Sequence, residues 1–428
     1  GIFSITLCAQ IMIFPIMIYH FNIFGTYFLI TNLLAGIIIG PIIIIGILGI
    51  FSSIFCLKIA KMIFFIEKIL VEILILISKF SEFSMAKIYL PTPRIWQIII
   101  YYIIVFFIKS IYEVYSEKKP TATFIRVKNL LALAKYKFRK NKRKNIKKIM
   151  SILMILVVTF TIIKKQYNRL NINFVDVGQG DSCFIVTPKN KTILVDGGGS
   201  QSKEFDVGKS TLLPYILNKG HIQLDYIVIS HFDYDHVGGI LYIMQEINVK
   251  NIIIGKQFEN SQNYEKFVNL VQQKDIKVKI VEAGENIEIE KDLNFNVIWP
   301  NSKNKISDNS INNNSLVFKM KYKKFSMLFT GDIEEVAEKE ILKTYDAKNL
   351  ESLVLKVPHH GSKTSSSQEF LEAVKPKIAL IGVGKNNKFG HPSNITLEKF
   401  EKYGTKVYRT DQRGEITLKT DGNKIKIY

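Results

Sequence analysis

Cysteine is scarce in this sequence, and charged residues are missing from its beginning. The 428 residues include three cysteines, Cys8, Cys56 and Cys183, which are too few and too scattered for a disulfide framework or a cysteine metal site. Residues 1–57 contain no charged side chain, and the opening run lacks the basic region and small-residue cleavage site of a signal peptide. Because the sequence also begins with glycine, we expect it to be part of a longer membrane protein.

Acidic residues are rare in the first part of the chain. Residues 1–170 contain 23 basic and 5 acidic side chains, whereas residues 171–428 contain 35 and 32. The net charge of +21 therefore divides into +18 and +3, which indicates two domains of different kinds. The excess of lysine is no evidence that the second domain binds nucleic acid, because that domain is nearly neutral.

Long apolar runs predict a membrane α-helical domain over residues 1–170. Residues 1–57 can form at least two spanning helices, because one span needs roughly 20 apolar residues. The runs 95–108 and 149–163 are shorter, and we expect them to span with their flanking basic side chains extended to the lipid headgroups. About four spans are therefore expected.

Two features of this domain each allow two interpretations. Gly36, Gly40, Gly46 and Gly49 could form a surface for close helix packing in lipid, or they could simply bend a helix. Residues 61–83 mix charged with apolar side chains, which favours a helix at the membrane surface over one buried in lipid.

Residues 109–148 form a strongly basic segment, with 14 basic and 2 acidic side chains. Such a segment could bind nucleic acid or anionic lipid, but positive loops between spans usually remain in the cytoplasm. We favour a cytoplasmic loop, because the stretch 58–94 has only 6 basic residues. The span 149–163 would then carry the chain outward and place the second domain outside the cytoplasm.

Residues 171–428 have the pattern of a layered α/β domain. Short β-branched runs that end in Gly, Asp or Asn alternate with helical stretches, and the segment is long enough for one core. Predicted strands include 172–177, 226–229 and 326–330. The Asn/Ser-rich stretch 301–314 is predicted to be a loop.

Four side chains of the metal-ligand type follow the predicted strand 226–229. His231, Asp233, Asp235 and His236 lie within six residues, and two glycines behind them open a helix. One such residue alone would be an ordinary turn former or helix cap. Four in one loop at the edge of a sheet predict a metal site.

Further candidate ligands follow other apolar strands. Asp332 comes after a Thr-Gly pair at a strand end, where its carboxylate could bridge two ions or cap the next helix. His359 and His360 precede a glycine; we expect His360 to be the ligand and leave His359 open. Asp196 also ends a strand and is expected to orient a ligand histidine.

Two loops add candidates of a different kind. His391 lies beyond the predicted strand 378–383, and we expect it in the active site because five of the seven histidines fall in these motifs. Residues 362–367 are rich in serine and threonine, and they could contact phosphate or form a solvated loop.

The motif around His231 resembles the signature of the metallo-β-lactamase superfamily, His-x-His-x-Asp-His, with Asp233 in place of the second histidine. Together with the motifs at 173–182, 193–198, 328–332 and 355–362, it is similar to the DNA-internalisation competence proteins of the ComEC type. The resemblance is strong from residue 173 onward and loose before it. It implies an αββα metallo-β-lactamase-like sandwich over residues 171–428, attached to competence-type membrane helices.

The resemblance also implies two divalent metal ions, manganese or zinc. The expected ligands are His231, Asp233, Asp235, His236, Asp332 and His360, and Asp181, Asp196, Asn314 and His359 are expected to support them or to bind an ion themselves. No histidine occurs between His236 and His359, so by resemblance Asn313 or Asn314 replaces a usual ligand and one site is expected to be weak. The oxygen-rich set favours manganese or magnesium over zinc.

The function that the resemblance implies is DNA uptake across the cytoplasmic membrane. The second domain would hydrolyse DNA phosphodiesters of the strand that is not imported, with Asp235 and His391 as catalytic residues. The expected partners are single-stranded DNA, membrane lipid and other DNA-uptake proteins. Two alternatives remain: a hydrolase of another surface phosphoester, and a non-catalytic DNA conduit with a degenerate metal site.

Overall fold

The structure is a computed structural model that describes residues 2–83, 86–117, 169–200 and 205–428, with a few isolated residues between 125 and 154. It divides into two compact units, one formed by residues 1–148 and 217–220 and one formed by residues 149–216 and 221–428. Most of the basic segment 109–148 and of the expected span 149–163 lies outside the described residues.

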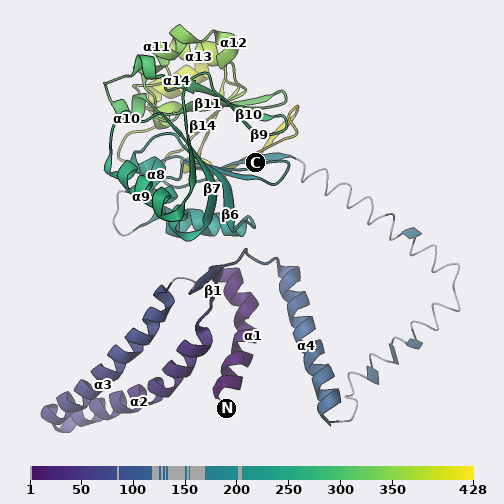
Figure 1. Cartoon of the computed structure of the whole chain (residues 1–428), viewed down its shortest axis with the longest axis vertical. Coiled ribbons are helices and arrows are strands. Elements are labelled where there is room, and N and C mark those ends of the chain that lie inside the picture. The colour runs from purple at the N-terminus through teal and green to yellow at the C-terminus, as the bar shows by residue number, and fades with distance from the viewer. Residues whose placement is uncertain are drawn as a thin grey trace. The chain divides into compact units, whose positions relative to one another are not determined.

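The N-terminal unit is built from long apolar helices (Figure 1). Its elements are α1 (Ile2–Phe21), β1 (Ile23–Gly25), α2 (Phe28–Phe55), α3 (Leu57–Ser78), the 3₁₀ turn η1 (Lys79–Glu82), β2 (Lys87–Tyr89) and α4 (Ile95–Glu117). Among the described residues, α1 and α2 contain segments that are long and apolar enough to cross a membrane, and the apolar part of α4 is shorter. The two N-terminal helices indicate membrane association.

Helices α2 and α3 lie side by side (Figure 1). Glycines of α2 lie where the two helices meet. A Cβ atom on Gly49 would lie 2.6 Å from the ring of Phe64, and one on Gly46 would lie 2.7 Å from Glu67 Oε1. Gly40, six residues before Gly46, has no such neighbour within 4 Å. The later glycines therefore lie at the contact between the two helices, where a side chain would have to displace Phe64 or Glu67.

The C-terminal unit contains an eight-stranded sheet in the order β17-β16-β3-β4-β5-β6-β7-β8. Its strands are β3 (Leu170–Phe174), β4 (Cys183–Val186), β5 (Thr192–Val195), β6 (Gln223–Ile229), β7 (Asn248–Gly255), β8 (Lys277–Val281), β16 (Ile416–Thr420) and β17 (Ile425–Ile427). Strands β5 to β8 are parallel. Their connections contain η2 (Gly208–Leu212), α7 (Leu213–Asn218), α8 (Tyr234–Glu246) and α9 (Gln262–Lys274).

A seven-stranded sheet in the order β15-β14-β13-β12-β11-β10-β9 faces the first. Its strands are β9 (Asn286–Glu290), β10 (Leu293–Trp299), β11 (Val317–Tyr322), β12 (Phe325–Phe329), β13 (Val354–Lys356), β14 (Ile378–Ile381) and β15 (Lys406–Arg409). The associated helices are η3 (Ser302–Asn304), α10 (Ser310–Asn313), α11 (Glu335–Thr344), α12 (Ala347–Leu350), η4 (Pro358–Gly361), α13 (Gln368–Val374), α14 (Asn394–Lys402) and α15 (Thr410–Arg413). The predicted αββα sandwich is confirmed.

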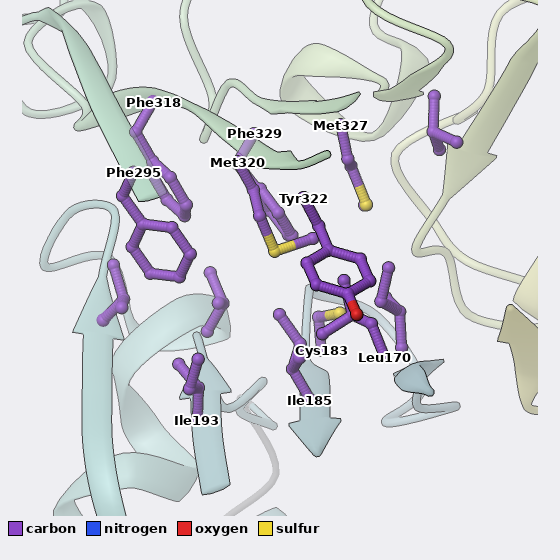
Figure 2. Packing of buried hydrophobic residues seen from close by; sticks show 14 of the residues in the cluster. Leu170, Cys183, Ile185, Ile193, Phe295, Phe318, Met320, Tyr322, Met327 and Phe329 are labelled. Carbon is purple, nitrogen blue, oxygen red and sulfur yellow. The ribbon is translucent and has the colours of Figure 1, made fainter. Parts of the chain in front are cut away.

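The core lies between the two sheets (Figure 2). Leu170, Ile185 and Ile193 come from the first sheet and face side chains of the second. Phe318 stacks on Phe329 with ring centroids 4.8 Å apart and an interplanar angle of 10°. A second apolar layer packs helices α11, α13 and α14 against the outer face of the second sheet. Burial on both faces explains the unbroken apolar runs of the central strands.

The carboxyl ends of parallel strands from both sheets carry the predicted site residues. Strands β5 and β6 are parallel in the first sheet, and β12, β13 and β14 are parallel in the second. The segments that follow these strands contain the motifs around Asp196, His231, Asp332 and His360. The fold therefore gathers residues that are far apart in the sequence at one edge of the sandwich.

Candidate metal centre

Helix α8 brings the first motif into position. It begins at Tyr234, directly after the cap residue Asp233, so Asp235 and His236 lie in its first turn. Gly239 packs tightly on the loop after β5: its N–H donates to the carbonyl of Gly198 at 2.9 Å, and a Cβ on Gly239 would clash with neighbouring backbone. The glycines after the motif therefore allow the helix to approach that loop.

Three side-chain atoms converge, and a fourth lies beside one of them. Asp332 Oδ2 lies 3.2 Å from His236 Nε2 and 3.2 Å from His360 Nε2. The two Nε2 atoms are 3.3 Å apart, and Asp235 Oδ2 lies 3.4 Å from that of His360. Tetrahedral metal bonds of roughly 2.0–2.1 Å place neighbouring ligands about 3.3–3.4 Å apart, so this set fits a divalent ion.

The far nitrogens of both imidazoles are fixed by the protein. His236 Nδ1 lies 3.1 Å from Asp196 Oδ2, whose other carboxylate oxygen accepts the N–H of Ser230 at 2.8 Å. His360 Nδ1 lies 2.9 Å from the carbonyl oxygen of Gly382 and can donate to it. A proton held on each Nδ1 leaves Nε2 as the metal-binding atom. Asp196 thus has the position expected of a residue that orients a ligand.

Asp181 lies behind the imidazoles. It belongs to a buried group with His236, Asp332 and His360 whose ligand atoms lie within 4.8 Å of one another. Its carboxylate, however, is near the Nδ1 atoms, 3.9 Å from that of His236 and 3.7 Å from that of His360. The Nε2 atoms instead face Asp332 and, from His360, Asp235, so the Asp181 carboxylate lies nearer the opposite nitrogens of the two rings.

Lys356 is a charged residue of this centre that the sequence analysis did not single out. Its buried ammonium group contacts the Asp181 carboxylate, lies 3.2 Å from Asp332 Oδ1, and donates to the carbonyl of Gly331 at 2.7 Å. Burial alone would lower its pKa, but Asp181 and Asp332 hold the pKa of Lys356 above its ordinary value. A lysine inside the apolar strand β13 was the signal available in the sequence.

The charges of the metal-free cluster balance one another. Burial opposes ionisation, yet His236, His360 and Lys356 hold the pKa of Asp332 well below its ordinary value. In return Asp332 raises the pKa of both imidazoles well above the ordinary value despite their burial, assisted by Asp196 at His236 and by Asp181 at His360. Without a metal, protons on the two histidines therefore offset the carboxylate charge.

His231 and Asp233 lie beside this cluster. His231 is buried, its Nδ1 is 2.9 Å from the Ser230 hydroxyl, and its Nε2 has no hydrogen-bond partner among the described residues. That nitrogen lies 3.9 Å from Asp233 Oδ2. Burial and the neighbouring His236 lower the pKa of His231 to about 3, so its imidazole is neutral and can act as a ligand.

The loop that contains three asparagines offers a different residue from the one expected. Asn314 donates to the carbonyls of Ile306 and Ser310 at 2.8 and 2.7 Å, so its amide holds the loop together. Asn313 is likewise bonded to Glu334. Asn312 is buried, lines the cavity at the cluster, and its Oδ1 has no hydrogen-bond partner within the described part of the chain.

Two further histidines, His359 and His391, flank the cluster. His359 adopts the left-handed conformation and turns toward Glu334, with Nδ1 3.4 Å from a carboxylate oxygen, so it stays outside the converging set. His391 is half-buried, and its ring centroid lies 5.6 Å from that of His359 and 6.5 Å from that of His360. Burial and these two neighbours lower the pKa of His391 to about 4.

A cavity of about 680 Å³ opens onto the cluster. Asp233, Asp235, Asp332, His360 and His391 line it together with Asn312, His359 and Phe389. In the serine-rich stretch 362–367, the N–H groups of Ser366 and Ser367 donate to the buried carboxylate of Glu338 at 2.6 and 2.7 Å. These two N–H groups are therefore not available to bind a phosphate.

Comparison with known proteins agrees with this architecture. Residues 1–113 match the family described as Competence protein, and residues 175–305 match the Metallo-beta-lactamase superfamily. The chain is 35% identical to ComE operon protein 3 of Bacillus subtilis over 57% of its length and 32% of that protein. It is 28% identical to Recombination protein 2 of Haemophilus influenzae over 75% of its length and 38% of that protein.

Among solved structures, the metallo-β-lactamase fold protein YhfI from Bacillus subtilis aligns with 56% of this chain and 96% of that one, at 12% identity and a TM-score of 0.36. The chain spans about a third of the length of the two curated relatives. It joins a competence-protein segment to a metallo-β-lactamase domain, as in ComEC-type proteins. The chain thus combines a region similar to competence proteins with a region similar to the metallo-β-lactamase superfamily, and the buried His/Asp cluster suits a metal-dependent hydrolase.

Metal binding should release protons, because His236 and His360 carry raised pKa values in the metal-free cluster and must be neutral to bind an ion. At pH 7 we expect about two protons released for the ion that binds between His236 and His360, and affinity that rises with pH. Isothermal titration of the metal-free protein with zinc or manganese, in buffers of different ionisation enthalpy, measures both. His221→Gln, outside the cluster, should leave the proton count unchanged. Affinity independent of pH would contradict this charge balance.

Proposed function

We propose that the C-terminal unit is a metal-dependent phosphodiesterase that hydrolyses DNA, within a membrane protein for DNA uptake. The observation that carries the proposal is the convergence of two imidazole nitrogens and one carboxylate oxygen at 3.2 to 3.3 Å, with Asp235 Oδ2 3.4 Å from His360 Nε2, at a cavity that Asp235, Asp332 and His360 line. DNA as the substrate is supported by the relatives, one of which is named Competence protein ComA.

Asp235, His236, Asp332 and His360 would hold one ion. A bound divalent ion lowers the pKa of water and stabilises charge that develops on a phosphoryl group. Asp235 has a partly exposed side chain that faces the cavity, so its carboxylate can also hold a proton of the attacking water. His391 is neutral at pH 7 because of its lowered pKa, and it can share a proton with a substrate oxygen.

His231, Asp233 and Asn312 would hold a second ion more weakly. Among the described residues, His231 Nε2 and Asn312 Oδ1 have no hydrogen-bond partner, which supports this assignment because buried polar atoms without partners are rare. One imidazole, one carboxylate and one amide oxygen form a harder ligand set than three imidazoles. Such a set favours manganese or magnesium over zinc.

The proposed domain boundary lies near residue 170, with membrane helices before it and the hydrolase in residues 171–428. We place the hydrolase outside the cytoplasm, on the strength of the basic segment 109–148. There it would meet incoming DNA and would degrade the strand that is not imported.

Asp235→Asn should reduce DNA hydrolysis by the full chain in detergent by about 10²–10⁴-fold, because it removes an ion ligand and a proton acceptor together. The measurement is manganese-supported cleavage of a labelled single-stranded oligonucleotide. Asp275→Asn, at the exposed end of α9, is the matched control and should leave the rate unchanged. A wild-type protein that cleaves small phosphodiesters but no DNA would identify a different substrate. Equal rates in Asp235→Asn and wild type would refute the metal-hydrolase assignment.

Asn312 should determine whether a second ion binds and which metal it is. Asn312→Ala should reduce bound manganese from two ions to one, while Asn312→His should tighten zinc at the second site, because imidazole suits zinc. Manganese and zinc content at equilibrium, measured by mass spectrometry, reports both changes without an activity assay. Asn263→Ala is the control, since Asn263 lines the same cavity but donates its amide to Phe232. Two tightly bound ions in Asn312→Ala would exclude this ligand.

Thiol labelling should show on which side of the membrane the hydrolase domain lies. We would place a cysteine at Lys189, in the exposed turn between β4 and β5, after replacing Cys8 and Cys56 by serine. Cys183 can remain as an internal control, because it is buried and its pKa is raised by burial. A membrane-impermeant maleimide should label Lys189→Cys in intact cells whose wall is permeable to it. Labelling only after lysis would place the domain in the cytoplasm.

A further inference from the structure

The metal cluster does not lie in a blind pocket. Its cavity adjoins a second one of about 780 Å³, and Gly178, Gln179 and Phe389 line both. The Gln179 side chain accepts the N–H of Gly384 at 3.2 Å, which fixes this shared boundary. A side chain at Gly178 would project into open space. A chain molecule whose phosphodiester lies at the cluster can therefore continue along the surface.

Three aromatic rings lead from the cluster to this second cavity. His360 is buried, His391 is half-buried, and Phe389 is 56% exposed. The ring centroids of His360 and His391 are 6.5 Å apart, and those of His391 and Phe389 are 6.1 Å apart. The last two rings are nearly parallel, with an interplanar angle of 9°. Phe389 thus presents a flat apolar face at the mouth of the metal cavity.

The loop that carries Phe389 is held in place by Asn387. The Asn387 side-chain oxygen accepts the N–H groups of Phe389 and His391, both at 3.1 Å. Its amide nitrogen donates to the carbonyls of His391 at 2.7 Å and Gly384 at 3.2 Å. The ring is therefore exposed on an ordered turn, so its exposure does not come from an absence of local structure.

Positive charge accompanies the exposed ring. Lys385 and Lys388 lie on the same loop, are exposed, and line the second cavity. One acidic residue there, Asp411, forms two hydrogen bonds with the Arg409 guanidinium at 3.0 and 2.6 Å. The other, Asp176, accepts the N–H of Gly178 at 3.1 Å. The two lysines are thus available to a ligand that combines negative charge with flat apolar groups.

We propose that Phe389 stacks on a nucleobase of single-stranded DNA beside the phosphodiester that occupies the cluster, and that Lys385 and Lys388 contact the adjoining phosphates. Aromatic platforms in a basic groove are how proteins bind single strands without reading sequence. In a duplex the bases are stacked inside and cannot reach the ring. This inference rests on the proposed function, since it takes DNA as the substrate.

The test is fluorescence anisotropy with the full chain in detergent and EDTA, so that binding is measured without hydrolysis. The probes are a labelled oligothymidylate and an oligonucleotide of equal length whose central nucleotides lack bases. Phe389→Leu keeps an apolar side chain but removes the flat ring. It should weaken oligothymidylate binding about 5- to 150-fold, the equivalent of one stacked base, and leave the abasic probe unaffected. Phe389→Trp should bind at least as tightly as wild type.

The double variant Lys385→Gln/Lys388→Gln should weaken the binding of both probes equally. It should also reduce the slope of log affinity against log salt concentration by about 1.4. Tyr428→Leu removes an exposed ring that lines neither cavity and is the matched control. Equal binding of the two probes by wild type, unchanged binding in Phe389→Leu, or a preference for duplex DNA would overturn the inference. Binding with these responses but no cleavage in manganese would refute the nuclease assignment alone. Cleavage with no effect of Phe389→Leu would refute only the stacking site.

Discussion

The two oxygens of the Asp332 carboxylate have different partners, and the arrangement of the metal centre depends on that division. Oδ1 lies against the ammonium group of Lys356, whereas Oδ2 faces the Nε2 atoms of His236 and His360. A buried carboxylate is costly unless it is paired, and here the lysine supplies a permanent partner. One oxygen therefore stays oriented toward the ion whether or not the histidines are protonated.

The rest of the fold brings distant segments to this carboxylate. Asp332 follows β12, Lys356 ends β13, and the two strands are adjacent and parallel in the second sheet. His236 comes from the first sheet's side, on a helix that can approach the loop after β5 because Gly239 has no side chain. The core of large side chains between the sheets keeps these edges in register. The centre thus depends on backbone contacts and packing as much as on its ligands.

Much of this could be predicted from the sequence, because the candidate ligands are concentrated in short motifs at strand ends. The edge strands β8 and β9 were not predicted. In Lys277–Val281 and Asn286–Glu290 charged and apolar residues alternate, as suits half-exposed edge strands, but such short runs are weak signals. The apolar central strands gave a much stronger pattern.

Other details that were not predicted concern the direction in which side chains point. The sequence does not distinguish Asn312, Asn313 and Asn314 from one another. Their roles differ because the Asn314 amide is hydrogen-bonded within the loop and the Asn313 amide is hydrogen-bonded to Glu334. The serine-rich stretch after His360 also looked suited to phosphate. Its N–H groups at Ser366 and Ser367 instead bind Glu338, a carboxylate some 30 positions earlier, which no local pattern reveals.

The left-handed backbone of His359 and His360 limits how this site can change in evolution. Both residues have positive φ angles, 49° and 52°, and this double turn directs one ring to the cluster and the other toward Glu334. Branched residues such as valine or isoleucine are strained in that conformation, whereas asparagine and glycine tolerate it. Neutral drift at position 359 would therefore sample a narrow set of residues even if its imidazole had no chemical role. The absence of branched residues at this position among relatives would therefore be weak proof of catalysis, since the backbone alone already excludes them.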